Sequence, residues 1–292
     1  MNIDSTVKYN IKILKSGKYT EVYIYHDKIF TRSKKKEKDK LAEKIDRLVD
    51  ELIIDDAKLK TMDEPPLTEK QLKAIEKIRK KNTKRTELSI NKSKQKLRRL
   101  INSNLGKYKQ LDKFLTLTYG YKMKDRNKAH NHLKVFIRNI RRKYGDQIEY
   151  IAVLEIQDGS RRKDKDKKKA TNNLHWHILL FDMPFVQYEI LQKSWKHGHL
   201  DIRKIQEFGD VAGYLTNYLG DDDILSLGHK KSYTSSKGLF RLEEELTTDK
   251  VKVANIMNEE GSKILYNGTF QNGQVGKFTY MKIENTNYNK KE

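Results

Sequence analysis

The first part of the chain alternates apolar and polar residues and then becomes charged with helical spacing. Residues 7–30 alternate and end in the aromatic-rich run EVYIYHDKIF, which predicts a β-hairpin that turns near residues 16–17. Residues 31–59 and 70–109 space their apolar side chains at helical intervals among many charges, so both are predicted to be helical. We therefore expect residues 1–110 to form a hairpin followed by basic helices.

The middle of the chain, residues 111–240, is richer in apolar residues and alternates between two periods. Runs of β-branched and aromatic residues predict strands, and apolar spacings of three and four predict helices. The order β-α-β-β-α-β-α indicates an α+β fold with helices mainly on one face of a sheet. The polar run 158–173 is predicted to be a loop. The expected strands cover residues 114–119, 148–157, 174–181 and 199–203, and the expected helices cover 124–144, 187–195 and 210–219.

The last part, residues 241–292, is predicted to be a C-terminal extension that is rich in β-structure. It begins with helical character at the acidic run Glu243-Glu244-Glu245. Alternation then continues over residues 264–283, interrupted by Asn-Gly pairs. This pattern predicts two or three further strands joined by tight turns.

The charge of the chain indicates a polyanionic partner. Among 292 residues, 62 Lys and Arg stand against 40 Asp and Glu, which gives a formal charge of +22. Residues 70–109 contain fifteen basic and two acidic residues and so carry +13 of this excess. Helices of this composition can lie along phosphates, although a solvated helical face has the same composition.

Composition also excludes several classes of protein and site. The absence of Cys excludes disulfides, a thiolate nucleophile and thiolate metal sites. No run approaches the roughly 18 apolar residues of a membrane span. The first ten residues are polar, whereas a signal peptide has an apolar core. We expect a cytoplasmic protein with no membrane partner.

The run LHWHILLF contains the strongest candidates for chemistry. On a strand, His175 and His177 project from one face about 7 Å apart, while Trp176 projects from the other. Two imidazoles in this arrangement can share a divalent ion, and the neighbouring strand offers Glu155, with Gln157 on the same face. The alternative is a pair of structural histidines that bond to hydroxyl or carbonyl groups.

A second His-x-His pair, His197 and His199, serves as a comparison. It lies around a glycine between a predicted helix and a predicted strand. Strand alternation is not guaranteed there, so a turn or surface role is favoured over metal binding.

The run VAGYLTNYLG places two tyrosines four residues apart, which is one face of a helix. Apolar residues on the opposite face can hold the helix against the sheet and present Tyr214 and Tyr218 together. A phenol ordinarily titrates near pH 10, about three units above neutral, so it is a weak nucleophile unless a metal ion or a base assists. The alternative is a pair of amphipathic tyrosines in a helix–sheet interface.

These motifs occur in one order inside a basic chain: FLTLTY, then Glu155 and LHWHILLF, then VAGYLTNYLG. In this combination the sequence resembles the HUH endonucleases, specifically the rolling-circle replication initiators of bacterial plasmids and bacteriophages. The resemblance covers about residues 111–240. It implies an antiparallel sheet of the kind found in RNA-recognition folds.

The resemblance also implies a reaction. A tyrosine attacks one strand at the replication origin, forms a 5′-phosphotyrosine, frees a 3′-OH primer and later rejoins the strand. Tyr214 occupies the first nucleophile position and Tyr218 the second, and the implied ion is Mg²⁺ or Mn²⁺. The implied metal ligands are His175, His177 and Glu155, with Gln157 in reserve.

Partners follow from the same resemblance and from the basic composition. The chain is expected to bind single-stranded origin DNA and the duplex beside it. Family members often carry lysine three residues after the first tyrosine, whereas this chain has Asn217, which supplies no positive charge. The expected DNA contacts are Lys94, Lys96, Arg98, Arg99, Arg161, Arg162 and Asn217.

The chain has no phosphate-binding loop of the Gly-x-x-x-x-Gly-Lys type, so a host helicase would unwind the DNA and a host polymerase would extend the primer. Two alternatives stay open. A relaxase or transposase would use the same chemistry on other DNA sequences. A non-catalytic origin-binding protein would use the histidines structurally.

Overall fold

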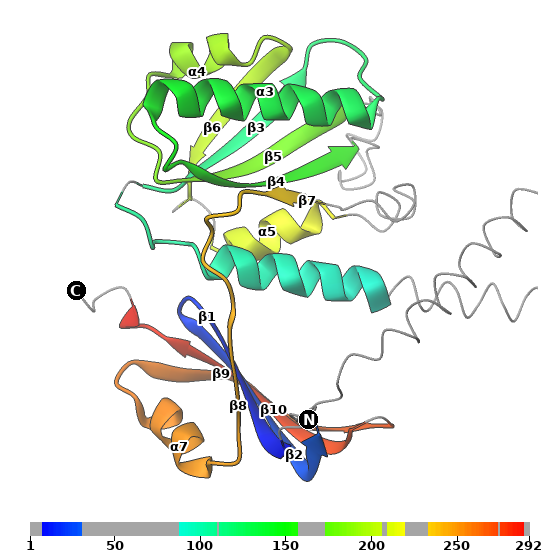
Figure 1. The fold of residues 1–292 in the computed structure, drawn as a ribbon, viewed down its shortest axis with the longest axis vertical. Coiled ribbons are helices and arrows are strands. Elements are labelled where there is room, and N and C mark those ends of the chain that lie inside the picture. The colour runs from blue at the N-terminus through cyan, green and yellow to red at the C-terminus, as the bar shows by residue number, and fades with distance from the viewer. Residues whose placement is uncertain are drawn as a thin grey trace, which may run out of the picture.

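The structure is a computed structural model that describes residues 8–30, 88–109, 111–156, 173–205, 209–219, 233–273 and 275–288. Within this part of the chain the strands form two five-stranded antiparallel sheets, one above the other in Figure 1. The helices predicted before residue 88, and nearly all of the predicted loop 158–173, lie outside the described residues.

The first sheet contains the elements predicted from the middle of the chain, in the predicted order. Its strand order is β6-β3-β5-β4-β7, and every neighbouring pair is antiparallel. The α+β class and the β-α-β-β-α-β order of an RNA-recognition type of fold are therefore confirmed. The elements are β3 (Lys113–Tyr119), α3 (Arg126–Tyr144), β4 (Glu149–Ile156), β5 (Leu174–Phe181), α4 (Tyr188–Ser194), β6 (Gly198–Lys204), α5 (Val211–Asn217) and β7 (Tyr233–Ser235).

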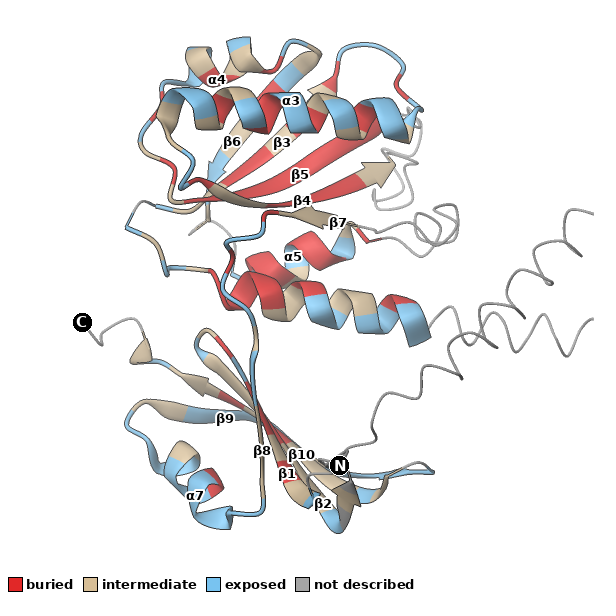
Figure 2. Cartoon of the chain, viewed as in Figure 1, coloured by how far each residue is buried: buried red, intermediate tan, exposed pale blue. Residues whose placement is uncertain are grey.

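Helices cover both faces of this sheet, and β5 is buried along its whole length (Figure 2). Residues alternate along β5, so Trp176 joins a core beneath α3 while Leu179 joins a second core on the other face. That second core contains Leu215 of α5 and Leu97 of the helix over residues 88–102. The thin apolar stripe predicted in the basic segment is therefore the packing face of this helix.

The second sheet joins the two outer parts of the chain. The predicted hairpin is confirmed as β1 (Lys8–Ser16) and β2 (Tyr19–Phe30), and the predicted tail strands are confirmed as β9 (Ser262–Asn272) and β10 (Gly276–Asn285). β10 pairs with β2, so the segments treated as an N-terminal appendage and a C-terminal extension share one sheet, with order β8-β1-β2-β10-β9. The division of the chain at residues 110 and 240 stays a prediction.

The helical character predicted for Glu243, Glu244 and Glu245 is wrong. These residues lie in β8 (Glu243–Thr247), which pairs with β1, and the carboxylate of Glu244 lies 2.9 Å from Nζ of Lys12. Glutamate favours helices only weakly, and pairing along a strand edge outweighs that preference. The helix, α7 (Lys250–Asn258), starts after this strand and is capped by Asp249.

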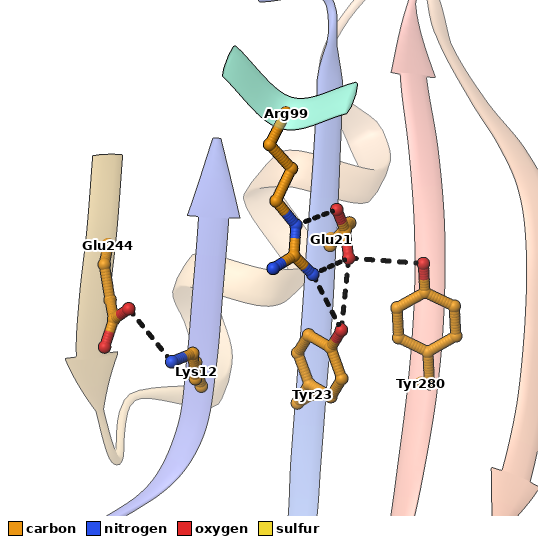
Figure 3. A network of polar contacts seen from close by, with 6 residues as sticks. All are labelled: Lys12, Glu21, Tyr23, Arg99, Glu244 and Tyr280. Carbon is orange, nitrogen blue, oxygen red and sulfur yellow. Dashed lines mark hydrogen bonds and ion pairs between the residues drawn. The ribbon is translucent and has the colours of Figure 1, made fainter. Parts of the chain in front are cut away.

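The helix over residues 88–102 lies between the two sheets (Figure 1). On the side facing the second sheet, Nε and Nη2 of Arg99 donate to the carboxylate of Glu21 in β2 at 2.8 and 2.6 Å (Figure 3). The hairpin turn also reaches the end of this helix. Gly17 has a φ of +57°, and a Cβ there would lie 2.0 Å from the carbonyl oxygen of Asn102. Glycine is therefore required where this turn meets the helix.

Candidate active site

The two histidines of β5 project from the same face of the first sheet, as the sequence predicts. Trp176 points to the opposite face, where its indole N–H donates to the carbonyl oxygen of Ala129 in α3 at 3.3 Å. His175 and His177 face α5, and their exposed fractions are 9% and 5%. The histidine pair is thus buried beneath the helix that carries the tyrosines.

Hydroxyl groups of β3 contact both imidazoles. Oγ1 of Thr118 lies 3.1 Å from Nδ1 of His175, and Oγ1 of Thr116 lies 3.4 Å from Nδ1 of His177. The strand register places each threonine directly opposite its histidine. Contacts of this kind fix the orientation of the rings, and they are also the hydroxyl contacts expected of structural histidines.

Glu155 reaches the same group from β4. It is paired in register with His175, and its Oε2 lies 2.7 Å from Nε2 of the neighbouring His177. The side chain of Glu155 is 14% exposed. The three residues proposed as ligands therefore gather on one face of the sheet, whereas Gln157 lies outside the described residues.

The helix α5 brings both tyrosines to this group. The ring of Tyr218 stacks on the imidazole of His177, with centroids 3.6 Å apart and planes 13° apart. The hydroxyl of Tyr218 donates to the hydroxyl of Tyr214. Tyr214 packs edge-on against Phe114 and remains 37% exposed, so it is the tyrosine that a large substrate can reach.

The start of α5 is fixed by Asp210. Its carboxylate accepts the backbone N–H of Gly213 at 2.9 Å and forms an ion pair with Arg98 of the helix over residues 88–102. A carboxylate at the N-terminus of a helix satisfies a backbone donor and interacts favourably with the helix dipole. Arg98, expected to contact DNA, thus also holds the tyrosine helix against its neighbour.

The donor set suits a divalent ion in its chemistry, because two imidazoles and a carboxylate approach from adjacent strands. Within the described ranges, no three or more His, Asp and Glu side chains are arranged as a metal site. Nε2 of His177 and Oε2 of Glu155, both proposed ligand atoms, bond to each other instead. An ion that used both atoms would have to replace this hydrogen bond.

The residues expected to bind DNA are spread over several environments. Lys96 and Asn217 are exposed, whereas Arg99 is bonded to Glu21. That hydrogen bond raises the pKa of Arg99 above its ordinary value. Arg161 and Arg162 lie outside the described residues. The structure therefore brings together the proposed ligands and tyrosines but does not gather the proposed DNA contacts.

The second His-x-His pair does not form a shared site. The ring of His197 stacks on His132 with centroids 3.7 Å apart, and burial together with His132 lowers the pKa of His197. His199 lies in β6 opposite Thr118, exposed on the face that carries His175. Sequence reasoning did not single out the threonines of β3, although their alternation in FLTLTY was a usable signal for a shared face.

Comparison with known families supports the reading of this segment. Residues 112–223 match the model of a family described as replication-associated protein, of the ORF2 type. This range contains every proposed ligand and both tyrosines, and the family fits the resemblance to a rolling-circle replication protein. Comparisons with curated proteins and with solved structures gave no significant match. Among the described helices, none is both long and apolar enough to cross a bilayer.

Proposed function

We propose, from the match of residues 112–223 to replication-associated proteins, that this chain is a rolling-circle replication initiator that nicks and rejoins one DNA strand. One observation carries the proposal. The exposed Tyr214 is hydrogen-bonded to Tyr218, and Tyr218 in turn stacks on His177 above the buried histidine–carboxylate group. A nucleophile at the surface is thereby placed beside residues that can bind a cation.

The proposed reaction is a transesterification. The phenolic oxygen of Tyr214 bonds to phosphorus, and the bond from phosphorus to the 3′ oxygen breaks. The phenol loses one proton and the departing 3′ oxygen gains one, so the reaction needs no nucleotide cofactor and leaves the number of phosphodiester-type bonds unchanged. The hydroxyl of Tyr218 already donates toward the oxygen of Tyr214, an orientation that stabilises a developing phenolate.

The proposed cofactor is Mg²⁺ or Mn²⁺, held by His175, His177 and Glu155. Such an ion, when bound, supplies positive charge for the non-bridging oxygens of the scissile phosphate. The threonine hydroxyls of β3 would keep the imidazoles in place. Tyr218 would act as the second nucleophile when the strand is rejoined. Host helicase and polymerase, in a bacterial cytoplasm, complete the proposed setting.

A non-catalytic DNA-binding role is the second candidate, and one observation favours it. The direct bond between His177 and Glu155, together with the threonine contacts, is an arrangement that stabilises a core without any ion. In that case the chain would bind DNA but would form no covalent adduct. A relaxase or transposase would form the same adduct on different DNA, and the genes beside the coding sequence would distinguish it.

A covalent capture assay tests the proposal. A labelled pool of single-stranded oligonucleotides of random sequence is incubated with the protein and Mn²⁺, and adducts that survive denaturation are counted and sequenced. We expect an adduct that falls at least about a thousandfold in Tyr214→Phe, since the nucleophile is lost. The matched control is Tyr121→Phe, which alters a tyrosine that is 48% exposed but lies outside α5.

Two results would count against the nicking reaction. An undiminished adduct in the double variant Tyr214→Phe, Tyr218→Phe would sink the assignment of the nucleophile. The variant His177→Ala gives the second test: we expect it to bind DNA and lose cleavage. If it instead unfolds while no adduct forms with the unaltered chain, the structural role of the histidines is favoured.

A further inference from the structure

A continuous set of aromatic rings covers one face of the second sheet, away from the candidate active site. Strand pairing sets Tyr23 opposite Tyr280, and Phe278 opposite both Tyr25 and Phe270. Neighbouring rings have centroids between 4.9 and 6.3 Å apart, so they contact one another across four strands. The rings belong to Tyr9, Tyr23, Tyr25, Tyr266, Phe270, Phe278 and Tyr280, which we call the aromatic face.

The sheet has its apolar core on the other side. Ile11, Val22 and Met281 alternate with the aromatic positions on their strands and pack with Val253 of α7. Cross-strand aromatic pairs do stabilise a sheet, so packing explains part of the aromatic face. It does not explain why Tyr266 and Phe270 stay 46% and 41% exposed. Large exposed aromatic surface of this kind is typical of a binding site.

A cleft of about 400 Å³ opens between the aromatic face and the helix over residues 88–102. Its walls combine rings with polar side chains, and Figure 3 shows Arg99, Glu21, Tyr23 and Tyr280 meeting where the helix crosses the sheet. The rings that line it are Tyr19, Tyr23, Phe270, Phe278 and Tyr280.

The charges of the cleft favour an anion. Arg98, Arg99 and Lys282 line it together with one carboxylate, Glu21, which already bonds to Arg99. Burial and the neighbouring Arg98 lower the pKa of Lys282, so like charges face each other there. The adjoining residues 88–109 contain seven basic residues and no acidic one. A phosphate in this cleft would relieve the repulsion between the cations.

We propose that the aromatic face and its cleft bind single-stranded DNA. Unpaired bases stack on Tyr266, Phe270 and the rings beside them, and phosphates lie against Arg98 and Lys282. Stacked rings beside cations are the usual means of holding single strands, because every unpaired base offers a flat face that a duplex hides. The choice of DNA over other polyanions rests on the proposed function, while the binding surface is separate from Tyr214.

Equilibrium binding tests this surface without any cleavage. The full chain carrying Tyr214→Phe and Tyr218→Phe is titrated into a labelled single strand of about twenty thymidines, and fluorescence anisotropy is followed. We expect Tyr266→Ala and Phe270→Ala to weaken binding about tenfold each, the effect of removing one stacking ring. The matched control is Ile264→Ala, which removes a side chain of similar exposure (45%) from the opposite face of β9.

Further variants separate stacking from folding. The double variant Tyr266→Leu, Phe270→Leu keeps apolar side chains in the sheet and should still lose affinity, whereas Phe270→Trp should keep it. Thermal unfolding of each variant confirms that the sheet is intact. Lys282→Gln should lower the slope of log affinity against log salt by about one, since one phosphate contact is lost.

Three results would overturn the proposal: unchanged affinity in the double leucine variant of β9, an equal loss for duplex DNA, or tighter binding of RNA of the same length. The protein used here cannot form the tyrosine adduct. Failure of the capture assay therefore leaves this test intact, and failure of this test leaves the nicking reaction open.

Discussion

At the scale of single residues, His177 is the most constrained side chain of the candidate active site. Three elements contact its ring: Thr116 of β3, Glu155 of β4 and Tyr218 at the end of α5. Each contact fixes a different direction, so the ring can neither turn nor shift without disturbing a neighbour. A residue held this way either orients a reactive group or stabilises the layer between sheet and helix. The capture assay with His177→Ala distinguishes the two roles.

Asp112, just before β3, gives a prediction about pH. Burial raises its pKa to about 6, although the backbone N–H of Gly106 opposes this. The folded state therefore holds a proton more tightly than the unfolded state, whose carboxyl titrates near 3.8. Stability contributed by this group is present below about pH 4 and is lost as the pH rises through 6.

The variant Asp112→Asn removes that loss and keeps an oxygen for Gly106. We expect it to be more stable than the unaltered chain at pH 7, by about 1–2 kcal/mol after allowance for partial exposure. The difference should shrink toward zero near pH 4. Chemical denaturation at both pH values measures it, and the exposed Asp146→Asn should show no such trend. Equal stability of Asp112→Asn and the unaltered chain at pH 7 would contradict the argument.

At the scale of elements, the sequence predicts what depends on local period and misses what depends on a distant partner. The period of two in LHWHILLF was enough to place His175 and His177 on one face, and the spacing of Tyr214 and Tyr218 was enough to place them together. The strand at Glu244 was missed, because only pairing with β1, more than 200 residues earlier, makes it extended. The pair between Arg99 and Glu21 is likewise invisible to any local window.

The capping of α5 is an element-scale feature that can be tested. Asp210→Ala removes both the acceptor for the N–H of Gly213 and the partner of Arg98. We expect a loss of about 1 kcal/mol in the free energy of unfolding, typical of a lost N-cap. Adduct formation by Tyr214 should fall more than stability alone explains, because the first turn of its helix loosens. Asp201→Ala, which removes an exposed pair with Arg203, is the matched control.

At the scale of the whole molecule, one ion pair joins the two sheets. Burial alone would raise the pKa of Glu21, but the hydrogen bonds and charge of Arg99 hold it below its ordinary value. The side chains of Arg99 and Glu21 are only 18% and 13% exposed. The stability that the pair contributes is therefore present above the ordinary carboxyl pKa of 4.5 and is lost as the pH falls below it.

Glu21→Gln tests this connection. The variant keeps the shape of the side chain but leaves the guanidinium half-buried without its counter-charge, so we expect a loss of about 2–3 kcal/mol near pH 7. Thermal unfolding measures the loss, and limited proteolysis shows whether the second sheet separates first. Glu244→Gln, which weakens a more exposed pair with Lys12, should change stability by less than about 1 kcal/mol. Similar losses in both variants would argue against a special role for the joint.

The pairing of β2 with β10 also sets an order for events during synthesis. Tyr280 bonds to Glu21 across 259 positions of the chain, with the first sheet and its helices lying between them in sequence. The ribosome therefore releases all of the tyrosine-bearing unit before β2 can find its neighbour. Until then the hairpin of β1 and β2 exposes an unpaired edge, which is an opportunity for aggregation. A chain stalled before residue 276 should carry a folded first sheet and an open second one.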